Sequence, residues 1–141
     1  MAHPDQRKII DTMDETMLRR VHPSQVSKDG RPSKTSFYPR PADNGLVSVD
    51  RSSVVTPSGC YENYVRAKAL VVGQGGIWGV TVEECARSTL SCLSDPLDST
   101  EYGGPNSAHA LIDMTQLSEE QIAAAASKLY ALAKTRGKLA P

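Results

Sequence analysis

The sequence is poor in aromatic side chains: Phe, Trp and Tyr make up 5% of its 141 residues, with one Trp and one Phe. Aliphatic residues must therefore build most of the core. The apolar fraction of 39% is below the roughly 45–50% of an average globular domain. A chain of this length can still bury a core without a metal ion or a disulfide. We expect one domain over residues 1–141, with a modest core and much irregular chain.

Long apolar segments are also missing. No apolar run approaches the roughly 18 residues of a membrane-spanning helix. The first residues, MAHPDQRKIIDTMDE, are charged and lack the apolar stretch of a secretory signal peptide. The three cysteines are odd in number, and Cys85 and Cys92 do not have the spacing of zinc ligands. We therefore expect a cytoplasmic protein with reduced, buried thiols, no disulfide, no metal and no membrane contact.

The chain carries no net charge, because 16 Lys and Arg balance 16 Asp and Glu. A dedicated nucleic-acid-binding domain is usually basic, so nucleic acid is an open but not the favoured partner. The basic residues concentrate in segment 19–40, which holds six Lys and Arg and one Asp. This segment is interpreted either as a solvated loop or as a local binding patch for phosphate or an acidic partner.

The common sequence signatures of cofactor binding and catalysis are absent. There is no phosphate-binding loop of the Walker type and no G-x-S-x-G nucleophile motif. The segment GQGGIWG (73–79) precedes an expected strand, whereas a dinucleotide-binding glycine loop opens a helix. A tight turn is the simpler interpretation, so we expect no cofactor.

Helical periodicity occurs in three segments. In 5–20 the apolar residues Ile10, Met13 and Met17 recur at helical spacing. Segment 56–73 begins with Thr-Pro, a favourable helix start, and segment 115–137 contains a Ser118–Gln121 capping box. We predict a helix in each segment, with a loose tail at 138–141.

The remaining apolar segments favour strands. Their residues are 44–53, 75–83, 88–96 and 109–114. In the last of these, Ala110 and Ile112 face one way and His109, Leu111 and Asp113 the other. Thr81-x-x-Glu84 is a competing capping-box pattern that starts a helix near Val82. We predict a small α+β domain in which about three helices pack on a mixed or antiparallel sheet of 3–4 strands.

Residues 22–44 are rich in proline and show no apolar periodicity, which predicts a long basic loop. Phe37 and Tyr38 lie side by side within it, and a pair of aromatics could pin the loop to the domain or anchor a partner. The expected binding residues are Arg20, Arg31, Lys34, Phe37, Tyr38 and Arg40.

Two histidines border polar loops and are the candidates for acid–base chemistry. His22 stands in RRVHPSQ at the start of the basic loop, and His109 stands in PNSAHA at the end of the second loop. As a pair they could act as general acid and base in cleaving a phosphodiester, with Arg51 binding the phosphate. The structural alternative is that His22 caps a helix end and that His109 holds a neighbouring loop.

Three aspartates near expected strand ends, Asp50, Asp95 and Asp113, could in principle bind a divalent metal. Turn capping explains Asp95 and Asp113 more simply, so no metal site is expected. Blocks such as GLVSVDR are of the kind that a small bacterial family shares, but none of them carries a recognisable activity.

Two functions remain open after these exclusions. The first is a small bacterial cytosolic protein-interaction domain, which binds a protein partner or itself through the basic loop. The second is a histidine-dependent enzyme acting on RNA or another phosphate-containing nucleotide, through His22, His109 and Arg51. The sequence alone does not decide whether the protein is an enzyme.

Overall fold

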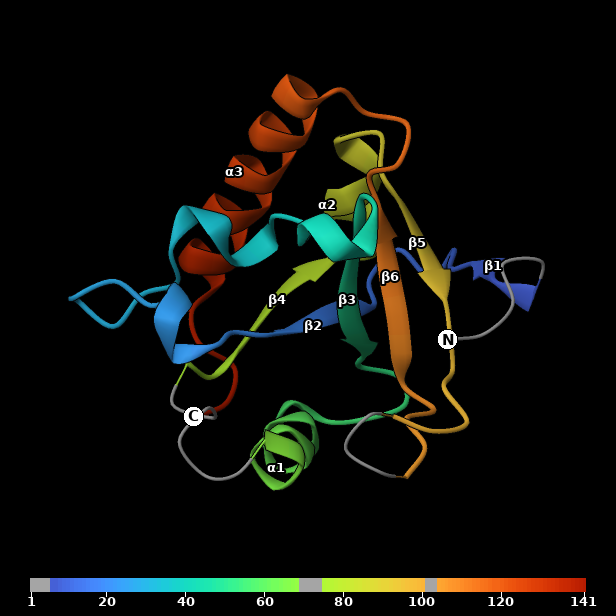
Figure 1. Cartoon of the computed structure of the whole chain (residues 1–141), viewed down its shortest axis with the longest axis vertical. Coiled ribbons are helices and arrows are strands. Elements are labelled where there is room, and N and C mark those ends of the chain that lie inside the picture. Colours follow the sequence, from blue (N-terminus) through green and yellow to red (C-terminus); the bar gives the residue numbers. More distant parts are fainter. Residues whose placement is uncertain (1–5, 69–74, 101–103) are drawn as a thin grey trace.

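The computed structural model describes residues 6–68, 75–100 and 104–141, and in them six strands form one sheet (Figure 1). The strand order is β1-β5-β6-β3-β2-β4, and neighbouring strands are antiparallel. The strands are β1 (Lys8–Ile9), β2 (Thr16–Arg20), β3 (Leu46–Arg51), β4 (Ile77–Thr81), β5 (Ser91–Ser94) and β6 (His109–Asp113). The α+β class is confirmed, but the expected 3–4 strands were too few.

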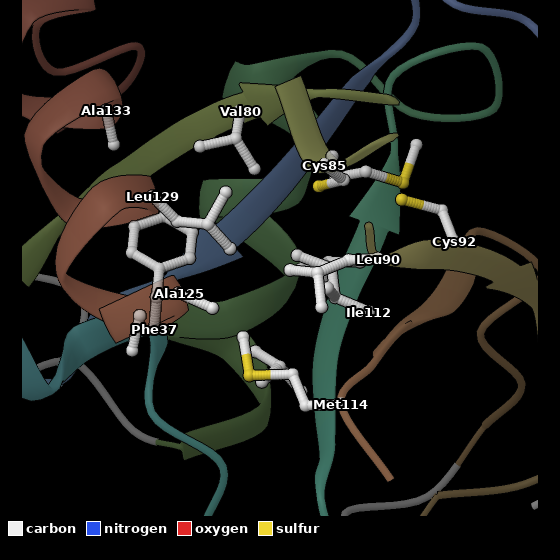
Figure 2. Packing of buried hydrophobic residues seen from close by; sticks show 14 of the residues in the cluster. Phe37, Val80, Cys85, Leu90, Cys92, Ile112, Met114, Ala125, Leu129 and Ala133 are labelled. Carbon is white, nitrogen blue, oxygen red and sulfur yellow. The ribbon is translucent and has the colours of Figure 1, made fainter. Parts of the chain in front are cut away.

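The larger core lies between one face of the sheet and two helices, α2 (Val82–Arg87) and α3 (Glu119–Arg136). Successive strand residues point to opposite faces, so Val47 and Val49 of β3 reach this core together. Helix α3 contributes a stripe of small and aliphatic side chains that includes Ala125 and Leu129 (Figure 2). The small alanines allow the helix to approach the sheet closely.

Helix α1 (Pro57–Lys68) covers part of the opposite face. Its Cys60 packs with Leu18 of β2 and Ile77 of β4 in a second, smaller apolar cluster. The domain therefore has three layers, with α1 and α3 on opposite sides of the sheet (Figure 1).

The helix predicted at 5–20 was wrong, because these residues form β1, a turn and β2. Met17 and Leu18 are both fully buried, one on each face of the sheet, whereas a helix would place them on adjacent sides of one cylinder. The five pairs of β2 with β4 decide the strand conformation. The helical spacing from Ile10 to Met17 was coincidental, since the intervening Met13 is exposed.

Helix starts were predictable from local chemistry. Ser118 and Gln121 form the expected capping box of α3, and the Thr56 hydroxyl accepts a hydrogen bond from the backbone N–H of Gly59. The Thr81 capping box also forms, so β4 runs directly into α2 as the two overlapping patterns suggested. The end of the helix predicted at 56–73 lies partly outside the described residues.

Residues 22–44 contain three short 3-10 helices, η2 (Pro23–Gln25), η3 (Lys34–Phe37) and η4 (Pro41–Asp43). Phe37 is fully buried in the core that α3 covers (Figure 2). The segment lacks long regular elements, but it is part of the folded body of the domain.

The C-terminal residues are docked, contrary to the expected loose tail. Ile77 and Ala140 pair through an isolated bridge beside β4, and Ala140 is buried. Gly79 of β4 permits this approach, because an added Cβ would lie 2.9 Å from the Leu139 side chain and 2.6 Å from that of Thr16. Within the described ranges, no helix has the length and apolarity needed to cross a membrane.

Candidate functional site

A buried polar cluster lies on the sheet face opposite the larger core, where β3 and β6 pair. Asp50 of β3 and His109 of β6 are directly opposite in the register, so their side chains lie on the same face. Both residues are more than nine-tenths buried, as is Asp95, which follows β5. Buried charged groups require partners, and each of these residues has them.

His109 is held by Asp95 through one ring nitrogen. Nδ1 lies 3.0 Å from the carboxylate oxygen Oδ2 of Asp95 and 3.0 Å from its backbone oxygen. Both neighbours are acceptors when Asp95 is ionised, so Nδ1 must carry the hydrogen. In the neutral ring, Nε2 is then the basic nitrogen.

The Nε2 atom of His109 has no hydrogen-bond partner among the described residues. It is nevertheless accessible to solvent, because the only fully enclosed unpaired side-chain atom in the described part of the chain is Oγ of Ser88. His109 thus combines a held Nδ1 with an open, basic Nε2, the arrangement of a general base.

The carboxylate of Asp95 has a second partner. Arg7 donates from Nε to Oδ1 over 2.9 Å, which leaves Oδ2 for His109. Asp95 is completely buried, and the Arg7 side chain is 13% exposed. The three side chains therefore form a chain of contacts from the edge of the sheet to His109.

Asp50 accepts hydrogen bonds from three side chains, of which only Arg20 also carries a positive charge. Arg20 of β2 donates to Oδ2 over 3.0 Å from Nε, and Asn106 donates to Oδ1 over 2.9 Å. The Cys60 thiol donates to Oδ2 over 3.1 Å. Burial and the neighbouring Asp50 raise the pKa of Cys60 to about 12, so this thiol stays protonated and donates. Through these hydrogen bonds, Asp50 connects β3 to β2, to α1 and to the loop before β6.

A pocket of about 90 Å³ opens beside this cluster, where β2 and β3 separate. In the described sheet the two strands pair at Met17–Arg51 and Leu18–Asp50 and then diverge. The pocket is lined by Arg19, Arg20, Ser48, Val49, Asp50 and His109.

Arg19 spans the gap between the separated strands. Its Nη1 donates to the Ser48 carbonyl and its Nε to the Ser36 carbonyl, each over 2.8 Å. No carboxylate of the described residues forms an ion pair with it. Burial lowers the pKa of Arg19 to about 10, and the positive charge of Arg40 contributes in the same direction. The guanidinium is still charged at neutral pH.

The Arg19 charge at the pocket is therefore not neutralised by an ion pair within the described residues, although Asp43 offsets part of it from a greater distance. The charges of Arg20 and Asp50 cancel because the two side chains form an ion pair. The hydrogen bonds of the Arg19 side chain go to the uncharged backbone carbonyls of Ser36 and Ser48. Burying an unpaired cation is costly, and an anion in the pocket would relieve that cost. The local electrostatics thus favour a negatively charged ligand.

The other predicted catalytic residues lie elsewhere. His22 is exposed and caps η2, because its Nδ1 accepts a hydrogen bond from the Ser24 backbone N–H. Arg51 points to the sheet face opposite His109, since it follows Asp50 in β3. Its guanidinium binds the buried Glu15 through two hydrogen bonds of 3.0 and 2.8 Å.

Of the predicted binding residues, Arg20 lines the pocket and Phe37 is enclosed in the core, out of reach of a partner. Tyr38 is 38% exposed. Arg31, Lys34 and Arg40 are exposed on the 22–44 segment, where Arg31 and Arg40 form ion pairs with nearby aspartates.

Sequence reasoning missed Arg7 and included Arg19 only among the basic residues of 19–40, and it considered Asp50 and Asp95 as possible metal ligands, with turn capping as the simpler role of Asp95. The described residues contain no group of three His, Cys, Asp or Glu side chains that could hold a metal ion. Asp113 accepts from the Thr115 backbone N–H, as the turn-capping interpretation expected. Comparisons with protein families, curated proteins and solved structures found no match to this chain.

Proposed function

We propose that the protein is an enzyme acting on a phosphate-containing substrate, with His109 as the general base. The observation that carries this proposal is the Asp95–His109 pair, because His109 lines a pocket together with Arg19 and Arg20. Arg19 and Arg20 bind the phosphate group in this proposal. It retains the substrate class inferred from the sequence, with Asp95, Arg19 and Arg20 in place of His22 and Arg51.

The chemistry requires one proton to move in each direction. Nε2 of His109 accepts the proton of an attacking water or hydroxyl as the new O–P bond forms. The Asp95 carboxylate stabilises the resulting imidazolium. The bond from phosphorus to the leaving oxygen then breaks, and the imidazolium returns its proton to that oxygen. Arg19 and Arg20 stabilise the negative charge that develops on the phosphate oxygens.

The size of the pocket suits one phosphate group and not a whole nucleotide. Its volume of about 90 Å³ is well below the roughly 300–1,000 Å³ of pockets that enclose small molecules. The rest of the substrate must therefore lie outside, over the rim of the pocket. An RNA strand or a nucleotide that inserts only its phosphate meets this requirement.

The direct test is hydrolysis of bis(p-nitrophenyl) phosphate, p-nitrophenyl phosphate and short RNA oligonucleotides by purified protein. His109→Gln should reduce the rate about 10²–10⁴-fold without a large change in melting temperature. His22→Gln is the matched control, because it removes an exposed histidine outside the pocket. Equal rates for wild type and His109→Gln on every substrate that turns over would refute the proposal.

A binding measurement tests the phosphate site independently of catalysis. Inorganic phosphate should perturb the NMR signals of Arg19, Arg20 and His109, and Arg19→Lys should weaken its binding. Arg31→Lys is the control, because Arg31 is a solvent-exposed arginine that pairs with Asp29 and does not line the pocket. If both variants bind phosphate like wild type, Arg19 has no role in anion recognition.

A protein-interaction function is the second candidate, supported by the exposed cations Arg31 and Lys34 beside the half-exposed Tyr38. Such side chains occur as anchors in interfaces. Affinity purification from the native host, with and without RNase, tests this function. One stoichiometric protein that survives RNase and is lost with Tyr38→Ala would support it. We also propose a cytosolic location, consistent with three free, buried cysteines.

A further inference from the structure

The short edge strand β1 places Arg7 beside the Asp95–His109 pair. Lys8 pairs with Ser94 and Ile9 with Leu93, so Arg7 directly precedes the paired residues of β1 on one strand as Asp95 follows those of β5 on the other. The Arg7 Nε lies 2.9 Å from Oδ1 of Asp95, and the Arg7 side chain is largely buried. Although β1 has only two residues, its pairing with β5 holds the Arg7 guanidinium against the Asp95 carboxylate, which in turn orients His109.

The position of Arg7 has a chemical consequence. Asp95 has no solvent exposure, and an isolated carboxylate in such a place would take up a proton or require a nearby cation. Arg7 supplies that cation and leaves Oδ2 of Asp95 to accept from Nδ1 of His109. His109 can then remain neutral, with Nε2 as its basic nitrogen.

We propose that Arg7 is a positioning residue that keeps Asp95 ionised and His109 neutral, and so available as a base. The proposal rests on the proposed function in one respect, namely that a neutral His109 is the form needed for catalysis. The arrangement of charges itself does not depend on any substrate.

Without Arg7, the charge of Asp95 must be balanced by His109. Among the described residues, the imidazolium becomes the one cation in direct contact with the buried carboxylate, so the ring holds its proton to higher pH. The enzyme would then need a higher pH to free Nε2. In the described part of the chain, the other charged or titratable groups around His109 are Asp50, Arg19, Arg20 and Cys60, and they stay unchanged.

The test is an NMR titration of the His109 ring in the full-length protein, in wild type and in Arg7→Gln. We expect the pH midpoint of the His109 ring signals to rise by about one pH unit in Arg7→Gln. Arg7→Lys keeps the positive charge and should restore most of the difference. Lys8→Gln is the matched control. It also removes one positive charge, but from the exposed side chain of the residue next to Arg7.

A midpoint that does not move more in Arg7→Gln than in Lys8→Gln overturns the proposal, as does a downward shift. A purely structural role for Arg7 would lower the melting temperature and leave the midpoint in place. If Arg7→Gln does not fold, Arg7→Met repeats the measurement, since it keeps much of the aliphatic part of the side chain. On a substrate, the acid limb of the pH–rate profile should move by the same amount.

The titration tests the role of Arg7 and the activity assay tests the proposed function, so a negative result in one does not imply a negative result in the other. A shifted midpoint in a protein with no phosphoesterase activity would retain the role of Arg7 and refute the proposed function. Activity that depends on His109 but not on Arg7, with an unchanged pH midpoint, would retain the proposed function and refute the role of Arg7.

Discussion

Replacement of Phe37 by alanine tests whether the 22–44 segment belongs to the core. The Phe37 ring is completely buried among α3 side chains that include Ala125 and Leu129 (Figure 2). Truncation of a buried phenylalanine costs about 3–5 kcal/mol, partly from lost burial and partly from the cavity left behind. This is a large part of the roughly 5–15 kcal/mol that stabilises an ordinary domain.

Urea denaturation followed by circular dichroism measures this loss directly. Tyr38→Ala is the control, since the neighbouring Tyr38 is 38% exposed, and it should cost about 1 kcal/mol or less. The melting temperature of Phe37→Ala should fall by about 10 °C, at roughly 3 °C for each kcal/mol in a domain of this size.

The same variant should also affect the pocket, although Phe37 does not line it. Ser36, the preceding residue, accepts a hydrogen bond from Arg19, so loosening η3 removes a support of the guanidinium. Phosphate binding should weaken about fivefold, equivalent to about 1 kcal/mol. If Phe37→Ala costs less than about 1 kcal/mol and phosphate binds unchanged, the docking of this segment and its link to Arg19 are both wrong.

Three further predictions concern stability. Burial alone would raise the pKa of Glu15, but hydrogen bonds from Arg51 and Ser53 outweigh burial and lower it below its ordinary value of 4.5. Glu15 therefore stabilises the fold above pH 4.5 and loses this effect as the pH falls through the lowered value. The stability difference between wild type and Glu15→Gln, measured in urea, should shrink at lower pH, and a pH-independent difference would contradict this. Gly75→Ala should prevent native folding, as judged by proton NMR, because its Cβ would lie 1.7 Å from the Val21 carbonyl oxygen. Ser118→Ala removes the N-cap of α3 and should cost about 1 kcal/mol in urea denaturation, whereas no change would mean that the capping hydrogen bond is not stabilising.

Elements whose signal is local were predictable from the sequence. Capping side chains identify the start of α3, and short apolar segments bounded by turn residues identify β3 and β6, together with the alternation of their faces. The strand β2 was not predictable in this way, because a strand buried on both faces has no polar alternation to distinguish it from a helix. Its conformation is imposed by pairing with β4.

The prediction of the site was limited by the same error. Strand alternation would have put Arg20 on the face of Leu18, but only if residues 16–20 had been predicted as a strand. Residue type did single out His109, and the structure gives it a carboxylate partner in Asp95. No local signal indicates that Arg7 and Asp95, which are 88 residues apart, are in contact.

The sequence by itself determined the α+β class, the capped helices and the two faces of β3 and β6. These features depend on hydrogen bonds and side-chain periodicity within a few residues of each other. Only the tertiary structure decided that the first segment is strand, that residues 22–44 pack against α3, and that His109 contacts Asp95 and lines one pocket with Arg19 and Arg20. These features depend on the order and register of the strands, because register sets which distant charges share one buried face.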